Sequence, residues 1–345
     1  MRRKFNAPTS YDVASLAGVS QAVVSRAFQT KAPIATATRA KVLAAAQTLG
    51  YLPNAVARSL ITKRSGLVAV LISQDTQRET SEVLFSLSLA LQSHGFQPLL
   101  FTVAQESEAP YALSQALAHG VDAVVSCLDL PQDALSRAWQ RPCPVVMFNR
   151  EAPAALASSV ATDNRGASRL LASRLVTAGH RRFAVVNGPP DAPVARIRRD
   201  GFCDRLNELG ITDIGHVQGD YHYESGHTAG LALLQTTDPS LRPEAIFCVN
   251  DAMAIGVMDA ARFALMLRIP LDVSIVGFDN SPTGQRPAYR LTTFGQPFES
   301  LADRAACEIR NRLQGQTACT QVQLSAELVE RGSAQLFPRV ATAES

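Results

Sequence analysis

The sequence predicts a small all-α head of the helix-turn-helix type, followed by a larger α/β body of two lobes with parallel sheets. One observation is a change of periodicity. Apolar residues recur at helical spacing up to Gly50, whereas short apolar runs alternate with helical stretches from Leu67 onward. The other is charge: residues 1–64 hold ten basic side chains and one acidic side chain, a net charge of +9. The remaining 281 residues have a net charge of −6.

Such a charge distribution is typical of a polyanion-binding unit joined to a globular domain. On charge alone, the alternative is a solubilising basic tail. The regular helical patterns within the segment favour a folded unit.

Length and composition limit the class of protein. The chain has 345 residues, which at roughly 100–200 residues per domain allows two or three domains. The longest apolar runs, such as Leu67–Ile72, are far shorter than the roughly 20 residues that span a membrane. Arg2, Arg3 and Lys4 are not followed by an apolar stretch, so no secretory signal is predicted. The six cysteines form no Cys-x-x-Cys pair, which fits reduced thiols better than a zinc site. We expect a cytoplasmic, nucleoid-associated protein without a cofactor, a metal or a membrane partner.

The head is predicted to begin with a short helix capped by Thr9, because Asp12 three residues later completes a capping box. Gly18 ends this helix. Its apolar face is predicted to hold Val13, Ala14, Leu16 and Ala17. Ser20 can cap a second helix, Gln21–Phe28, with Val23, Val24 and Ala27 facing inward. Two short helices joined by a tight turn that contains glycine describe a helix-turn-helix.

A third helix is predicted from Thr36 or Thr38 to Leu49, with Gly50 as its C-terminal stop. Its inward residues are predicted to be Val42, Leu43, Ala46 and Leu49. Three helices of this size bury a very small core, so the head alone should be only marginally stable.

The second helix is the element that would read DNA. In a helix-turn-helix its N-terminal residues meet base edges in the major groove, and here these are Ser20, Gln21 and Ala22. Gln21 can pair with adenine, and Ala22 offers an apolar contact, for example to a thymine methyl. Further candidates on the same exposed side are Ser25, Arg26 and Gln29, of which Arg26 can read guanine or hold a phosphate. Tyr11 and Thr38 are expected at phosphates, which set register rather than sequence. For each single residue the alternative is a solvated helix surface.

These segments resemble the lac-repressor/galactose-repressor family of bacterial transcription regulators. In the head the resemblance lies in Tyr11–Ala14, Ala17–Ser20, Val24–Arg26, Thr38–Val42 and Gly50–Leu60. In the body it lies in Asp163–Asn164, Ala178–Arg182, Gly188–Pro189, Arg198–Phe202, Val249–Gly256, Val276–Asn280 and Leu291–Thr293. It covers about residues 9–335.

The resemblance implies a periplasmic-binding-protein-like body whose lobes close over a small molecule, with chain crossings near residues 163, 293 and 325. The domains are then residues 1–50 for the helix-turn-helix, 51–65 for the hinge helix and linker, and 66–340 for effector binding and dimerisation. Lobe one takes about 66–163 and 294–325, and lobe two about 164–293 and 326–340.

The segment Asn54–Leu60 is too short to be a stable helix alone. The resemblance implies a hinge helix that folds on operator DNA and lies in the minor groove beside its dimer mate, so that Asn54 joins the DNA-binding residues. Ala57 would permit close approach, and Leu60 would be a wedge in a central base step. From the residues alone, Leu60 could equally be a core residue of a linker helix.

Effector binding is expected at the carboxyl ends of the body's strands. Asn250 and Asp279 follow two of these strands, and Arg198 lies on the helix after the Phe183–Asn187 strand. The resemblance implies effector contacts for all three. The alternatives are that Asn250 and Asp279 merely cap the turns that follow them, and that Arg198 forms a surface or lobe-bridging salt bridge.

One segment departs from the family pattern. Where many members have an Asn-Pro-Phe-Phe-like stretch after the first strand, this chain has Gln77-Arg78-Glu79-Thr80. The exchange of aromatic residues for charged ones favours a polar or acidic effector, such as a sugar acid or sugar phosphate rather than a plain sugar, with Arg78 as its anion partner. His222 and Tyr223 are further residues that could reach the cleft; the alternative is that they are simply exposed at the start of a helix.

The function expected is a repressor that binds a pseudo-palindromic operator in double-stranded DNA as a homodimer and is switched by a small metabolite. A transport-type binding protein is the second hypothesis, which the basic head argues against. An α/β enzyme is the third. There is no Gly-x-Gly-x-x-Gly after the first strand, no P-loop, no nucleophile elbow and no metal-ligand spacing of histidines. Whether the metabolite is an inducer or a corepressor stays open.

Overall fold

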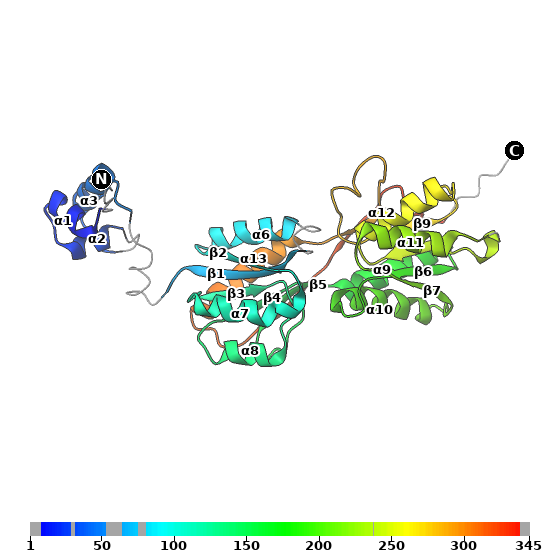
Figure 1. Ribbon diagram of the computed structural model, residues 1–345, viewed down its shortest axis with the longest axis horizontal. Coiled ribbons are helices and arrows are strands. Elements are labelled where there is room, and N and C mark those ends of the chain that lie inside the picture. The colour runs from blue at the N-terminus through cyan, green and yellow to red at the C-terminus, as the bar shows by residue number, and fades with distance from the viewer. Residues whose placement is uncertain (1–7, 29–31, 53–63, 75–80, 237, 339–345) are drawn as a thin grey trace, which may run out of the picture. The chain divides into compact units, whose positions relative to one another are not determined.

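The computed structural model describes residues 8–28, 32–52, 64–74, 81–236 and 238–338 (Figure 1). The chain divides into two compact units, Met1–Gly66 and Leu67–Ser345. Each unit is described by itself below.

The described part of the first unit contains helices α1 (Ser10–Ala17), α2 (Gln21–Ala27) and α3 (Thr36–Leu49). The predicted capping box is confirmed: the Asp12 amide donates to Thr9 Oγ1 and the Thr9 amide donates to Asp12 Oδ2. Gly18 and Gly50 end α1 and α3 in the left-handed conformation, at φ 61° and 66°.

The core of this unit is made of small side chains. It contains Val13, Ala14, Ala17, Val24, Ala27, Val42, Ala45 and Ala46. The predicted inward positions of Leu16 and Leu43 are wrong, because these side chains are 53% and 42% exposed. Both lie on the outer edge of an apolar stripe whose centre already fills the space between the three short helices.

The second unit begins with a six-stranded sheet in the order β11-β5-β4-β3-β1-β2, in which every neighbouring pair is parallel. Its strands are β1 (Leu67–Ser73), β2 (Gln97–Val103), β3 (Ala123–Ser126), β4 (Val145–Phe148), β5 (Ser158–Thr162) and β11 (Gln321–Leu324). The associated helices are α6 (Ser81–Ser93), η1 (Glu106–Glu108), α7 (Ala109–Ala118), α8 (Gln132–Trp139) and α13 (Phe298–Leu313). Helices α6 and α13 cover one face, while α7 and α8 cover the other (Figure 1).

A four-stranded parallel sheet, in the order β7-β6-β8-β9, forms the second lobe. Its strands are β6 (Phe183–Asn187), β7 (Ile214–Gln218), β8 (Ala245–Cys248) and β9 (Ser274–Val276). Its helices are α9 (Asn164–Thr177), α10 (Pro193–Glu208), α11 (Tyr223–Leu234), η2 (Pro239–Leu241), α12 (Asp251–Asp259) and the π-helical turn η3 (Ala260–Ala264). The two-lobed α/β prediction is therefore confirmed.

The chain passes between the lobes where β5 leads into α9, where β10 (Thr293–Gly295) leads into α13, and where β11 leads into β12 (Glu327–Val329). Strands β10 and β12 pair antiparallel beside the second lobe. These crossing segments bring residues of both lobes to the carboxyl ends of the two sheets.

Strand β5 was not predicted, and its composition explains why. It reads Ser-Ser-Val-Ala-Thr, and all five residues are buried. The Ser158 hydroxyl donates to Glu308 Oε1 at 2.6 Å, and the Ser159 hydroxyl donates to the Arg150 carbonyl at 3.0 Å. Partners from other parts of the fold thus satisfy the hydrogen bonds of these buried polar side chains. A search for apolar runs does not find a strand of this composition.

Candidate functional site

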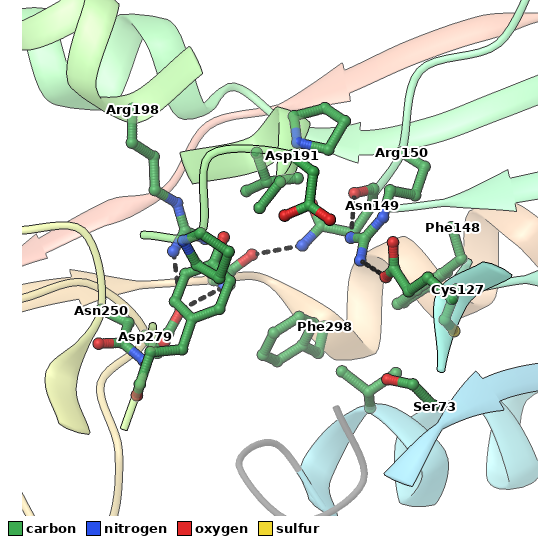
Figure 2. A pocket seen from close by; sticks show the side chains of 18 of the residues that line it. Ser73, Cys127, Phe148, Asn149, Arg150, Asp191, Arg198, Asn250, Asp279 and Phe298 are labelled. Atoms are coloured by element: carbon green, nitrogen blue, oxygen red, sulfur yellow. Dashed lines mark hydrogen bonds and ion pairs between the residues drawn. The ribbon is translucent and has the colours of Figure 1, made fainter. Parts of the chain in front are cut away.

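A cavity of about 370 Å³ lies between the two lobes of the second unit, at the carboxyl ends of their strands (Figure 2). The second lobe contributes Arg198, Asn250 and Asp279 to its wall, and the first lobe contributes Phe148 and Arg150. Its size is within the usual range for small-molecule sites, and open α/β sheets bind ligands at this edge.

Arg198 is held rigidly in the wall of this cavity. It lies on α10 and is 3% exposed. Its Nε donates to Asn164 Oδ1 and its Nη1 to the Val249 carbonyl, both at 2.8 Å. The guanidinium carbon lies 3.7 Å from the centroid of the Phe278 ring. Buried arginines need such partners, and here they fix the direction of the charged fork.

Asp279 faces Arg198 from the segment that follows β9. Arg198 Nη1 lies 3.3 Å from Asp279 Oδ1. The Asp279 backbone has a φ of 130°, a conformation rare outside glycine, and its amide donates to the Phe294 carbonyl at 2.9 Å. Such a backbone stores strain and persists only where neighbours hold it.

Burial raises the pKa of Asp279 to about 6, with the nearby Asp251 carboxylate adding to the rise while Arg198 opposes it. A carboxyl group in this range can accept hydroxyl groups from a ligand when ionised. Asp251 is itself buried, and its carboxylate accepts the Ser281 amide at 2.6 Å and the Thr293 hydroxyl at 2.5 Å. It therefore fixes the loop that contains Asp279 to the crossing strand β10.

Asn250 caps α12 and lines the cavity. Its Oδ1 accepts the Met253 amide at 3.0 Å, and its Nδ2 donates to the Tyr221 carbonyl at 2.8 Å. One amide hydrogen and one lone pair are left for a ligand. Tyr221 itself lines the cavity, whereas His222 and Tyr223 are not among the described lining residues.

The first lobe adds residues that the sequence did not predict. Arg150 lies two residues after the end of β4. Its Nη2 lies 3.3 Å from Glu106 Oε1 and its Nε 3.4 Å from Asp129 Oδ2. Phe148 and Phe298 are buried and give this side of the cavity an apolar wall (Figure 2). The signal that could have identified Arg150 is its position at the carboxyl end of a buried strand.

One amide joins the two halves of the cavity wall. Gln296, between β10 and α13, donates from Nε2 to Asp279 Oδ1 at 2.7 Å. Its Oε1 accepts Asn149 Nδ2 at 2.9 Å and the Thr162 hydroxyl at 3.0 Å. Asn149 and Thr162 belong to the first lobe and Asp279 to the second, so Gln296 bridges the lobes.

In the first unit, the residues predicted to read DNA share one property, which is exposure. Tyr11, Ser20, Gln21, Ala22, Ser25 and Arg26 are exposed, and Thr38 is half-buried. Ser20 is the N-cap residue of α2, but its side chain makes no capping hydrogen bond. The predictions on Gln29, Asn54, Ala57 and Leu60, and that on Arg78 in the second unit, lie outside the described residues.

Metal-ligating side chains do not gather in the described ranges: no group of three or more His, Cys, Asp or Glu residues there could hold an ion. In the same ranges, no helix is both long and apolar enough to cross a membrane.

Comparison with known proteins gives two family matches along the chain. Residues 9–54 match the bacterial regulatory proteins of the lacI family, and residues 172–334 match the periplasmic binding protein-like domain.

Curated relatives match over nearly the whole chain. The HTH-type transcriptional repressor CytR of Escherichia coli (strain K12) is 30% identical over 342 residues, which are 98% of this chain and 99% of the relative. The ribose operon repressor of the same strain is 32% identical over 94% of this chain and 99% of its own length.

Solved structures agree. A lac repressor dimer bound to operator and the anti-inducer ONPF has a TM-score of 0.84 at 27% identity, covering 95% of this chain and 99% of its own. A complex of the transcriptional regulator CelR with cellobiose has a TM-score of 0.69 at 28% identity, covering 94% and 99%. The chain belongs to the lacI family of bacterial regulatory proteins.

Proposed function

We propose that this chain is a repressor that binds a pseudo-palindromic DNA operator as a homodimer and is switched by a small hydroxyl-rich metabolite between its two lobes. The observation that supports this most is the inter-lobe cavity, in which Arg198, Asn250 and Asp279 converge. The relatives support the same reading: CytR and the ribose operon protein are named repressors, and a lac repressor dimer has been solved on its operator.

DNA reading is assigned to the exposed side of the first unit. Gln21 and Ala22 open α2 and would meet base edges, with Ser20, Ser25 and Arg26 beside them. Tyr11 and Thr38 would hold phosphates. For Gln29, Asn54, Ala57 and Leu60 the proposal rests on the family resemblance, with Leu60 as a minor-groove wedge. The domain bounds 1–50, 51–65 and 66–340 are proposed on the same basis, as are a cytoplasmic location and an association with the nucleoid.

The charges of the described cavity wall favour a neutral effector. Two cations, Arg150 and Arg198, face three carboxylates, Glu106, Asp191 and Asp279. Both arginines already lie against carboxylates, at 3.3 Å from Glu106 and Asp279. A phosphate or carboxylate would therefore enter a site without excess positive charge. A ligand whose hydroxyl groups bind Asp279 and Asn250, and whose apolar ring face packs on Phe148 and Phe298, suits this wall better.

The dimer face is proposed on the first lobe. Phe85 and Leu89, one helical turn apart on α6, are 65% and 53% exposed, and Leu100 on the edge strand β2 is 41% exposed. Apolar groups clustered in this way on a surface mark an interaction site. A second copy of the chain would bury them and set the spacing of two heads on a pseudo-palindrome.

The switch follows from linkage. An effector changes operator affinity only by its differential affinity for two arrangements of the lobes, a coupling that is commonly about 1–3 kcal/mol.

The test is operator selection with the full-length protein. Fragments of the source genome are bound at moderate salt, with and without a metabolite extract, and the enriched fragments are footprinted. A recurring pseudo-palindrome whose occupancy changes with the extract is the expected result. Enrichment of no sequence under either condition would refute the repressor function. An operator that is insensitive to the extract would refute the effector switch alone.

A further inference from the structure

The N-termini of α1 and α2 are joined by a side-chain hydrogen bond at the surface proposed to meet DNA. Gln21 Nε2 donates to Ser10 Oγ at 3.2 Å. Gln21 is the first residue of α2 and Ser10 is the first residue of α1. Ser10 is half-buried while Gln21 is exposed, so the contact holds an exposed side chain against a half-buried one.

The backbone at Ser10 is held in place by its neighbours in the first turn of α1. The preceding residue, Thr9, closes the capping box with Asp12, and the Thr9 hydroxyl lies 2.7 Å from Asp12 Oδ2. The residues that follow, Val13 and Ala14, lie in the core of the unit. The backbone of Ser10 therefore has a position that the fold sets, and its hydroxyl is placed beside the start of α2.

The hydrogen bond to Ser10 leaves the Gln21 amide with the two groups that can bind adenine. A glutamine amide has two N–H donors and one carbonyl oxygen. Ser10 takes one donor, so one N–H and the oxygen remain. Adenine presents an acceptor at N7 and a donor at N6 in the major groove, which is the complementary pair.

An exposed glutamine otherwise loses rotamer freedom when it is ordered on a base, and that loss weakens the contact. A side chain already held by Ser10 loses less. The resulting gain in affinity applies only to DNA that has the base bound by Gln21, because phosphate contacts do not depend on the direction of this amide.

We propose that Ser10 is a positioning residue for Gln21 and so a determinant of operator specificity. The proposal rests on the proposed function, in which α2 reads the operator. Neither Ser10 nor the contact is among the residues that the helix-turn-helix pattern of the sequence singles out.

The experiment is a double-mutant cycle with the full-length chain. An operator is first selected with the wild-type protein from a randomised duplex library. Affinities for this operator, for its single-base variants and for an unrelated duplex are then measured by fluorescence anisotropy at several salt concentrations. The proteins are wild type, Ser10→Ala, Ser10→Thr, Gln21→Ala and the double variant Ser10→Ala with Gln21→Ala. Ser15→Ala, an exposed serine on the same helix, is the matched control.

Ser10→Ala should lower discrimination at the base pair read by Gln21 by about threefold to tenfold, the range of one net hydrogen bond. Affinity for the unrelated duplex and the salt slope should not change. Ser10→Thr keeps the acceptor and should keep the preference, and Ser15→Ala should behave as wild type. In the double variant, Ser10→Ala should add nothing to the loss caused by Gln21→Ala.

Three results would overturn the proposal: an equal loss on all sequences, full additivity in the double variant, or the same loss with Ser10→Thr as with Ser10→Ala. Each leaves the operator itself intact and therefore leaves the proposed function standing. A selection without any enriched sequence would overturn both together.

Discussion

Gln296 Nε2 lies 2.7 Å from Asp279 Oδ1, so the amide that bridges the two lobes is bound to a carboxylate that lines the cavity. The other end of the amide accepts hydrogen bonds from Asn149 and Thr162 in the first lobe. A ligand hydroxyl that donates to Asp279 Oδ1 competes with this donor. Occupancy of the cavity and the relation between the lobes are thus linked through one side chain.

Replacing Gln296 by Met should loosen the contact between the lobes. The reason is that Asp279, Asn149 and Thr162 each lose a partner, while side-chain volume is nearly kept. Hydrogen–deuterium exchange measured by mass spectrometry should show faster exchange at the Thr162 amide, which donates to Asn149 Oδ1, and at the Asp279 amide. Gln314→Met, on an exposed residue at the end of α13, is the control.

Gln296→Glu gives a second, pH-dependent test of the same bridge. Two facing carboxyl groups share one proton at low pH, so exchange should approach the wild-type rate measured at the same pH as the pH falls and exceed it as the pH rises. Equal exchange in wild type and both Gln296 variants at every pH would disprove the bridge.

The raised pKa of Asp279 predicts a pH-dependent stability. The folded value is about 6 against the ordinary 3.8, so the native state binds the proton more tightly than the unfolded state. This contribution is fully present below about pH 4 and is lost as pH rises through about 6, up to ~3 kcal/mol. Asp279→Asn removes it. Denaturant unfolding should therefore show the variant gaining stability relative to wild type as pH rises from about 4 to 6. A difference between the two proteins that does not vary with pH would contradict the shift.

Arg198 should be intolerant of conservative exchange. Arg198→Lys keeps the charge but loses the fork that serves Asn164 and Val249 and the stacking on Phe278. Each hydrogen bond made by a charged group contributes about 1.5–3 kcal/mol, and thermal unfolding should show a lower melting temperature. Arg165→Lys is the control, because Arg165 pairs with Asp204 on the surface and such pairs contribute about 0–1 kcal/mol. Equal melting temperatures for the two variants would remove the structural role assigned to Arg198.

The sequence was a good guide to the second lobe's part of the cavity and a poor guide to the first lobe's part. Asn250 and Asp279 follow strands that apolar runs reveal, and Arg198 lies on the helix after such a strand. Arg150 lies at the carboxyl end of β4 and could have been found by the same rule, whereas Gln296 follows no comparable rule. Gln296 reaches the cavity because the chain crosses back to the first lobe at that point, and a crossing is a property of the tertiary fold.

Polar burial also limited what could be predicted. Strands β3, β4 and β6 are nearly free of polar residues, so each of them stands out in the sequence as an apolar run. Strand β5 was missed because Ser158 and Ser159 are hidden by partners distant in sequence, at Glu308 and Arg150. Hydrophobic periodicity does not contain that information.

Gly226→Ala should be strongly destabilising. Helices α11 and α12 cross so closely that a Cβ at residue 226 would lie 2.2 Å from the Met253 carbonyl oxygen, which is backbone and cannot rotate away. Overpacking of this kind costs typically about 1–3 kcal/mol. The displaced helix α12 begins beside Asn250, so the cavity wall should shift as well. Gly332→Ala, whose nearest atom is a flexible arginine side chain at 3.4 Å, should unfold like wild type. Equal denaturation midpoints for the two glycine variants would disprove the tight crossing.

Phe85→Lys should convert the dimer into monomers if α6 forms the interface. Phe85 and Leu89 stand on one exposed stripe, and a lysine there would bring two ammonium groups together across a two-fold axis. Sedimentation velocity should show a shift to the monomer at micromolar concentration. Operator affinity should then fall, because two heads on one duplex act at a high effective concentration and separate heads do not. Leu241→Lys changes a side chain that is 72% exposed in the second lobe and should leave the dimer intact. A Phe85→Lys protein that stays dimeric would place the interface on another face.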